Sequence, residues 1–299
     1  MAEKKHPILT VLIILVVTAL LLGTAMFVFL KLFEPSSNLS FTEKIGVISI
    51  DGTISDSRII TSQLVKFRKN KKIKAIILRI NSPGGSVGAT QDIYREIQKT
   101  IQTKKVIASM GSVAASGGYY VAAAANKIVA NPGTITGSIG VIMEFVRFKD
   151  LLNKIGINFE VIKSGEFKDI GSPLRELTER ERKLLNALIE DIQKQFVKEV
   201  AAGRNLTVEE VQKIADGRIF SGARAKELGL VDMLGNFQDA VDIAKNMVGI
   251  KGEVTLVYPE KTKLDLWKLL IKTAADSVTQ LLQNTKTQIE YRWNGFYSK

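Results

Sequence analysis

An α/β fold with a mostly parallel sheet, preceded by one N-terminal transmembrane helix, is the fold class that the sequence predicts. Two observations predict the sheet: short apolar runs alternate with amphipathic helical patterns, and glycine-rich turns follow two of those runs. A third observation predicts the membrane helix. Residues 8–30 contain no charged side chain and would span roughly 35 Å as a helix, which is enough to cross a bilayer.

The uncharged segment also sets the predicted domain organisation. A cleaved signal peptide is the alternative, since residues 23–25 (Gly-Thr-Ala) resemble a small-residue cleavage site, but the apolar run continues to Leu30. Lys4 and Lys5 favour a cytoplasmic N-terminus and an extracytoplasmic body at the cell membrane. We expect a cytoplasmic stub over residues 1–7, the membrane helix over 8–30, a tether over 31–43, a folded domain over 44–258, and a C-terminal amphipathic helix and tail over 259–299.

The positive net charge of the chain raises the question of which polyanion it could bind. Its 299 residues carry a formal net charge of +12, but the basic residues are scattered among acidic ones and not interleaved with aromatic residues. This pattern argues against nucleic acid as a partner. For an anchored protein, anionic membrane lipid is the nearer partner. The absence of cysteine is compatible with an extracytoplasmic location.

The first half of the folded domain alternates strands with helices. Strands are predicted at residues 45–50, 73–80 and 106–110, and helices at 57–69, 87–103 and 119–125. This order implies right-handed crossovers in a parallel sheet, whose ligand sites lie at the carboxyl ends of the strands. The glycine-rich turns after residues 80 and 110 both fall at such ends.

The second half is predicted to be richer in helix. Strands are predicted at 127–130, 139–143 and 159–162, helices at 148–155, 178–204, 206–215 and 237–248, and a loop with a helix at 219–231. Thr178 and Glu181 match a capping box, and the apolar face of that long helix contains Leu184, Leu188, Ile192 and Phe196. Residues 264–282 predict a helix packed on a neighbouring subunit, with a membrane-surface helix as the alternative.

Ser116 is the candidate nucleophile. It lies between small residues, after an apolar strand and before a run of helix formers, so free backbone N–H groups at the helix start could stabilise an oxyanion. The alternative is a turn that only packs two elements closely. The only histidine, His6, precedes the membrane segment and there is no cysteine, so a base for Ser116 must be a lysine or a carboxylate. A lysine can act as that base if burial lowers its pKa.

The Gly84-Gly85 turn is a second candidate for a part of a substrate-binding site. A glycine pair after a strand lets a backbone N–H approach a substrate oxygen, or lets a peptide lie along the strand edge. A tight structural turn is the alternative.

Five motifs occur together, in order, over about residues 44 to 250. They are Asn81-Ser-Pro-Gly-Gly85, Ser112-Val-Ala-Ala-Ser-Gly-Gly-Tyr119, Thr136-Gly-Ser-Ile-Gly140, Lys163-Ser-Gly-Glu-Phe-Lys-Asp-Ile-Gly-Ser-Pro173, and the segment Gly217 to Asp232. Together they resemble the signal peptide peptidase SppA family, in its short, single-copy form. The resemblance implies the Clp/crotonase fold.

The resemblance also implies roles for individual residues. It gives Ser116 as nucleophile, Lys168 as general base and Ser138 as the hydroxyl that orients the lysine. The oxyanion-hole donors would be the N–H groups of Gly85 and Gly117, although the sequence does not decide between Gly85 and Gly84. Spacing alone would not choose Lys168 over Lys163 or Lys127, and we expect Lys163, Asp169 and Ser172 to be structural.

By this resemblance the chain is a membrane-anchored serine endopeptidase that degrades residual signal peptides and other extended apolar peptides. It would need no cofactor and no metal, and it would assemble as a ring or dome of identical subunits with the Ser-Lys dyad formed where two subunits meet. Two alternatives stay open: an acyl-CoA enzyme of the crotonase fold, since that fold also uses glycine-rich oxyanion turns, and a non-catalytic membrane scaffold.

Overall fold

The computed structural model describes residues 16–26, 43–259 and 289–293 of the chain, which divides into a first unit, residues 1–42, and a second unit, residues 43–299. Residues 16–26 of the first unit are helical. No helix within the described ranges is long and apolar enough to span a bilayer. The predicted span of residues 8–30 extends past this helix on both sides, beyond the described residues, so it stays a prediction.

The second unit is built on an eight-stranded sheet with the strand order β10-β1-β2-β4-β5-β9, from which β6 and β8 branch off β4. Neighbouring strands run parallel throughout, except for the antiparallel pair β6–β8. The mostly parallel sheet predicted from the sequence is therefore confirmed. The strands are β1 (Lys44–Asp51), β2 (Ile73–Ser82), β4 (Lys105–Ala115), β5 (Lys127–Ala130), β6 (Ile135–Gly137), β8 (Ile219–Ser221), β9 (Met233–Leu234) and β10 (Thr255–Val257).

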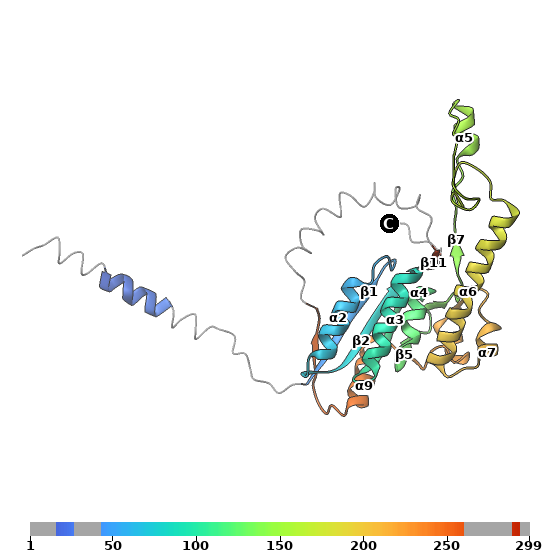
Figure 1. The fold of residues 1–299 in the computed structure, drawn as a ribbon. Helices are drawn as coiled ribbons and strands as arrows, with labels where there is room; N and C mark the ends of the chain where they lie inside the picture. Colours follow the sequence, from blue (N-terminus) through green and yellow to red (C-terminus); the bar gives the residue numbers. More distant parts are fainter. Residues whose placement is uncertain (1–15, 27–42, 260–288, 294–299) are drawn as a thin grey trace, which may run out of the picture. The chain divides into compact units, whose positions relative to one another are not determined.

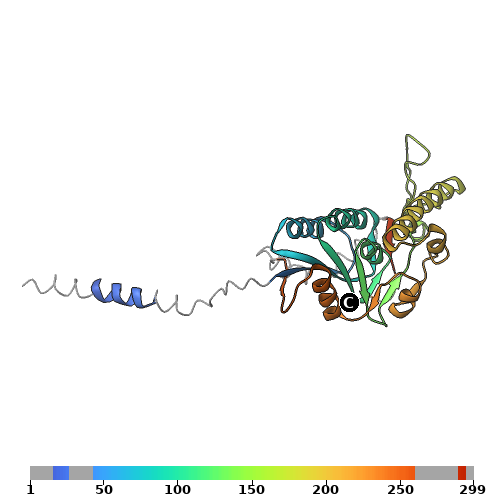
Figure 2. The same ribbon diagram turned by 90° about the horizontal axis from the view of Figure 1, so that it is seen from below.

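Helices cover both faces of this sheet (Figure 2). Since successive side chains of a strand point to opposite faces, Ile76 and Leu78 of β2 join one apolar cluster and Ile77 joins the other. The larger cluster lies under α2 (Arg58–Lys69), α3 (Val87–Ile101), α4 (Gly117–Ala123) and α6 (Glu179–Arg204), and the smaller one under α9 (Phe237–Val248). Burial on both faces explains why the central strands are continuous apolar runs.

Two predicted strands are wrong or misplaced. Residues 159–162 form no strand, and their apolar side chains are not buried in a sheet, since Ile162 is 94% exposed. The strand predicted at 139–143 is replaced by β6 and the short β7 (Ile142–Met143) on either side of Ser138. Ser138 has φ 50°, and a residue in this left-handed region interrupts a strand.

Three predicted helices of the second half also differ in part from the structure. The capping box of Thr178 and Glu181 is confirmed at the start of α6. Of the predicted apolar face, Ile192 and Phe196 are buried, whereas the other two residues, Leu184 and Leu188, are exposed because they lie on the half of α6 that extends beyond the sheet (Figure 1). The predicted helix at 206–215 is shorter, α7 (Val208–Gln212), and the helix expected within 219–231 is α8 (Gly222–Glu227).

A second, three-stranded sheet has the antiparallel order β3-β11-β7. β3 (Gly84–Ser86) follows β2 directly, whereas β11 (Ile289–Arg292) comes from the C-terminal tail. The sequence did not predict β11. The helix predicted at 264–282 lies outside the described residues.

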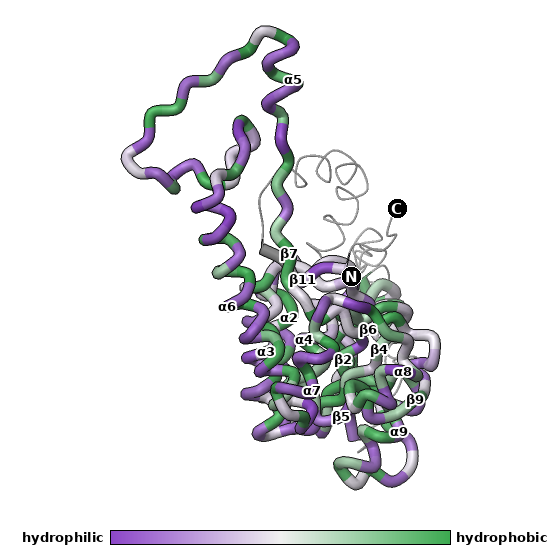
Figure 3. The backbone as a smooth tube through the Cα atoms, turned by 90° about the vertical axis from the view of Figure 1, so that its right-hand side faces the viewer, coloured by the Kyte–Doolittle hydropathy of each residue, from purple (hydrophilic) through white to green (hydrophobic). Residues whose placement is uncertain are grey.

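Residues 144–178 form a projection that we call the arm. It contains α5 (Lys149–Lys154), which confirms the helix predicted at 148–155, and it extends from β7 and returns to α6 (Figures 1 and 3). Its exposed apolar side chains are Val146, Phe148, Leu151, Ile155, Ile157, Phe159, Val161 and Ile162. The arm thus exposes to solvent apolar side chains of the kind that the sheet and its helices bury in the core.

Candidate active site

Three strand ends meet at the carboxyl edge of the parallel sheet. Ser82 of β2 is opposite Ala114 of β4, and Ala115 is opposite Gly137 of β6. The residues that follow each strand, namely the Gly84-Gly85 turn, Ser116 and Ser138, are therefore brought together by the register of the sheet. This edge is where a doubly covered α/β sheet binds its ligands.

Ser116 forms a sharp turn from β4 into α4. Its backbone has φ 53° and ψ −118°, a strained conformation for a residue with a side chain. Two backbone hydrogen bonds hold this turn: the Ser116 N–H donates to the Gly137 carbonyl, and the Tyr120 N–H donates to the Ser116 carbonyl, both at 2.8 Å. The side chain is 1% exposed, and its Oγ has no hydrogen-bond partner among the described residues. A strained strand-to-helix turn is a common setting for a nucleophilic serine.

Gly84 and Gly85 lie so close to neighbouring backbone atoms that a side chain at either position would overlap them. A Cβ on Gly84, which has φ 105°, would lie 2.7 Å from the Gly117 nitrogen and would overlap the carbonyl oxygen of Tyr291. A Cβ on Gly85 would overlap the backbone of Ile54. The Gly84 N–H donates to Ser82 Oγ at 3.1 Å, so the Gly84 N–H is already in use.

Ser138, like Ser116, has a positive φ, which residues with a side chain seldom adopt. Its φ is 50°, its side chain is 7% exposed, and its N–H donates to the Arg218 carbonyl at 2.8 Å. Because it follows Gly137, the residue paired with Ala115, it lies beside the Ser116 turn. The structure thus places the two serines next to each other.

The tail strand β11 lies along β3, with Tyr291 opposite Gly85 and the Trp293 N–H donating to the Pro83 carbonyl at 2.8 Å. Tyr291 is fully buried, and its ring stacks on Tyr120 with 5.1 Å between the centroids. Burial raises the pKa of Tyr120 to about 12 and that of Tyr291 further, so both phenols are neutral near pH 7. The sequence did not predict this contact, because it assigned residues 259–299 only to an amphipathic helix and a tail.

Lys168 lies on the arm, apart from the serines. Its side chain is exposed, its N–H donates to the Gly165 carbonyl at 3.1 Å, and its ammonium has no ion pair or hydrogen bond within the described part of the chain. Since Ser116 Oγ has no partner there either, one chain does not bring the two side chains into contact.

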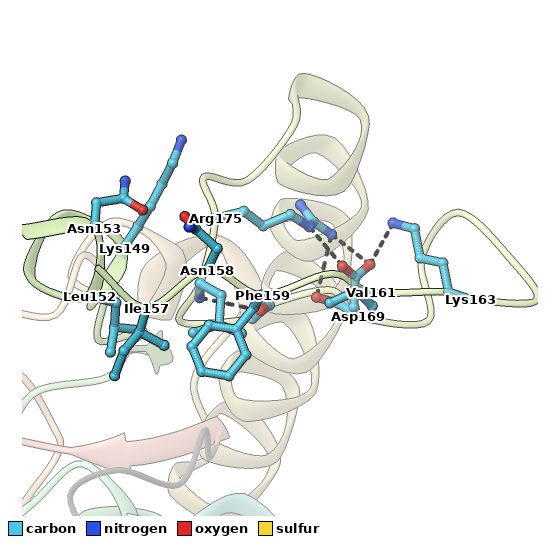
Figure 4. Close-up of a pocket in the computed structure, with 12 residues that line it drawn as sticks. Lys149, Leu152, Asn153, Ile157, Asn158, Phe159, Val161, Lys163, Asp169 and Arg175 are labelled. Carbon is cyan, nitrogen blue, oxygen red and sulfur yellow. Dashed lines mark hydrogen bonds and ion pairs between the residues drawn. The ribbon is translucent and has the colours of Figure 1, made fainter. Parts of the chain in front are cut away.

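The residue after Lys168 anchors this part of the arm through an ion-pair cluster (Figure 4). Asp169 accepts hydrogen bonds from Arg175 at 2.8 Å and from Lys163 at 2.6 Å, and Arg175 also donates to Glu181 at 2.8 Å. The hydrogen bonds from Arg175 hold the pKa of Asp169 far below its usual range and lower that of Glu181 to about 2. Lys163 and Asp169 therefore have structural partners in the arm.

Within the described part of the chain, no three His, Cys, Asp or Glu side chains lie close enough together to hold a metal ion. What converges at the edge of the sheet is a serine hydroxyl, a helix start and a glycine turn. At the edge of a parallel α/β sheet, that set is typical of a serine hydrolase.

The comparisons with known proteins carry the assignment further. The family model of the Clp proteases matches residues 37–134, and that of peptidase family S49 matches residues 98–251. The chain belongs to peptidase family S49, and it is accordingly a serine protease that acts on peptides.

Named relatives agree with this family. A protein of Synechocystis sp. named "Putative protease" is 47% identical over 227 residues, which cover 76% of this chain and 79% of the relative. One of Enterococcus faecium named "Putative signal peptide peptidase SppA" is 32% identical over 265 residues, covering 81% of this chain and 77% of the relative. "Serine protease SPPA, chloroplastic" of Arabidopsis thaliana is 39% identical over 244 residues, covering 76% of this chain and 36% of the relative.

Proposed function

We propose that this peptidase cleaves peptides with a dyad of Ser116 and Lys168 and that the two residues come from adjacent subunits. The observation that carries the proposal is the Ser116 hydroxyl, which is buried and unpaired at a strained turn at the start of α4. Such strain persists only where the surrounding structure holds it, and it is common at active sites.

In the proposed reaction, neutral Lys168 accepts the Ser116 proton as Oγ attacks the peptide carbonyl. The N–H groups of Gly85 and Gly117 stabilise the oxyanion, the proton passes to the leaving amine, and water hydrolyses the acyl-enzyme. Gly85 is favoured over Gly84 as a donor, because the Gly84 N–H already donates to Ser82. Ser138, beside Ser116, is in a position to orient the lysine of a neighbour.

The position of the arm supports a shared dyad. The arm carries Lys168 and projects beyond the sheet with a row of exposed apolar side chains, of which Ile162 is the most exposed. Exposed apolar surface of this kind marks a protein contact, and closed rings are a common outcome when identical subunits use two different surfaces. A second subunit would cover the arm and place Lys168 in the dry surroundings that a lysine base needs.

The substrate class follows from the sheet edge. β11 pairs with β3 in an antiparallel register, so this edge of β3 accepts an extended chain, and a substrate peptide would take the place of β11 there. With residues 8–30 as a membrane anchor and the body outside the cytoplasm, the peptides at hand would include apolar remnants of signal peptides. We infer a single-pass protein with a cytoplasmic N-terminus, in contact with membrane lipid.

The test of the nucleophile compares Ser116→Ala with Ser112→Ala, an exposed serine of β4. Ser116→Ala should lose peptide cleavage and covalent labelling by a fluorophosphonate, with an unchanged circular dichroism spectrum, whereas Ser112→Ala should keep both activities. Cleavage or labelling that persists in Ser116→Ala would show that another residue is the nucleophile.

A further inference from the structure

Thr90 carries a buried hydroxyl that the proposed reaction does not use. It lies in the first turn of α3, it is fully buried, and its Oγ1 has no hydrogen-bond partner among the described residues. Two other helical threonines behave differently: Thr61 donates to the Ser57 carbonyl and Thr100 to the Glu96 carbonyl, each four residues earlier. An unpaired buried hydroxyl costs stability, so its presence at this position needs a reason.

The place of this hydroxyl suggests the reason. A Cβ on Gly117 would lie 2.9 Å from Thr90 Oγ1, 3.1 Å from the carbonyl oxygen of Tyr291 and 3.2 Å from the Cα of Gly84. The threonine hydroxyl, a strand carbonyl and β3 therefore converge on one small volume beside Gly117. In the described part of the chain only two buried hydroxyls lack a partner, those of Thr90 and Ser116, and both adjoin Gly117.

We propose that the Thr90 hydroxyl is a third hydrogen-bond donor to the oxyanion, beside the N–H groups of Gly85 and Gly117. This inference rests on the proposed function, in which Ser116 is the nucleophile. The Tyr291 carbonyl marks where a peptide carbonyl lies when a strand runs along β3, and in that state Thr90 is unpaired. Attack by Ser116 makes the carbonyl carbon tetrahedral and places a negative charge on its oxygen, which then accepts the Thr90 hydrogen bond.

A donor that is paired only in the transition state has a recognisable signature. It raises kcat and leaves substrate binding nearly unchanged, because the ground-state carbonyl does not use it. It also lowers the stability of the free enzyme, because the hydroxyl is then buried without a partner. A threonine kept only for packing would carry the same stability cost but would leave kcat unchanged when valine replaces it, since valine fills the same volume.

The experiment uses the full-length protein with Thr90→Val, which removes the hydroxyl, and Thr90→Ser, which keeps it. Thr100→Val is the matched control on the same helix, since its hydroxyl is paired away from the site. For each variant we would measure kcat and KM on a peptide, the rate of fluorophosphonate labelling of Ser116, and the thermal unfolding midpoint. If Thr90→Val does not fold, Thr90→Ala takes its place.

We expect Thr90→Val to lower kcat and the labelling rate by about 10²-fold, the usual effect of losing one oxyanion donor, with KM within about threefold and an equal or higher unfolding midpoint. Thr90→Ser should keep kcat within about threefold. A wild-type kcat in Thr90→Val, or equal losses in Thr90→Val and Thr90→Ser, would overturn the role. Cleavage that survives in Ser116→Ala would instead refute the proposed nucleophile, whatever Thr90 does.

Discussion

The Ser116 turn and the arm are held in place by different forces. The turn is fixed by backbone hydrogen bonds, by glycines that admit close contact and by complete burial, with no charged side chain needed. The arm is fixed by ion pairs around Arg175 and leaves its apolar side chains in solvent. The difference teaches that the folded chain itself completes the surroundings of the nucleophile, whereas the arm, which carries the expected base, leaves exposed the apolar side chains that the proposed partner subunit would cover.

The largest effect should come from filling the space at the turn. Gly84→Ala puts a methyl group where the Tyr291 carbonyl lies and 2.7 Å from the Gly117 nitrogen, at a residue with φ 105°. Because the oxyanion position is blocked, kcat/KM should fall by about 10²-fold or more. Gly88→Ala, on the same segment with nothing near its Cβ, is the control and should keep activity. Normal turnover in Gly84→Ala would place the oxyanion elsewhere.

Mixing two inactive variants tests whether the two regions act across subunits. Ser116→Ala and Lys168→Ala should each be inactive, but in random mixed oligomers about a quarter of the junctions pair an intact serine with an intact lysine. Peptide turnover should therefore return to roughly that fraction of the wild type. Mixed oligomers that form but stay inactive would mean that the dyad lies within one chain.

Removing apolar surface from the arm should weaken assembly. Ile162→Ser takes away a side chain that is 94% exposed and that a neighbour would bury, so the subunit dissociation constant should rise by about tenfold. Ile59→Ser, an exposed isoleucine of α2 outside the arm, is the matched control. Sedimentation velocity over a dilution series measures both. A wild type that is monomeric and fully active would contradict this role of the arm.

The smallest effect should come from the ion pairs. The pKa of Glu181 is lowered to about 2, so its pairing with Arg175 stabilises the fold above about pH 4.5 and is lost as the pH falls toward 2. Arg175→Met should therefore lower the unfolding midpoint by a few degrees at pH 7, with a difference that shrinks below pH 4. Arg180→Met, which removes an exposed ion pair with Glu166 and a contact with the ring of Phe167, should change the midpoint less at every pH. An equal effect of both variants would rule out an anchoring role for Arg175.

The sequence predicted the parts of the molecule that depend on local patterns. The parallel sheet, α9 and the capping box of α6 follow from apolar periodicity and from a Thr-Glu spacing, and all three are confirmed. Ser116 could be recognised as a candidate from the sequence, because it lies among small residues between a predicted strand and a predicted helix.

The rest depends on contacts between distant segments, which periodicity does not encode. The pairing of β11 with β3 joins residues about two hundred positions apart, and a four-residue strand has too little pattern to be recognised. Residues 159–162 have the apolar pattern of a buried strand. In the structure, however, Phe159, Val161 and Ile162 are exposed on the surface of the arm and are not part of a sheet. Thr90 could have been suspected only from its place one turn after the glycine pair.

The tail strand β11 also has a consequence for the solubility of the protein. A short strand with an open edge is a template for pairing with any other extended chain, and this hazard leads to aggregation. β11 covers β3 on that edge with the chain's own backbone. A chain shortened before Ile289 would therefore expose the edge permanently, and it should precipitate at lower concentration than the full-length protein even while its eight-stranded sheet remains folded.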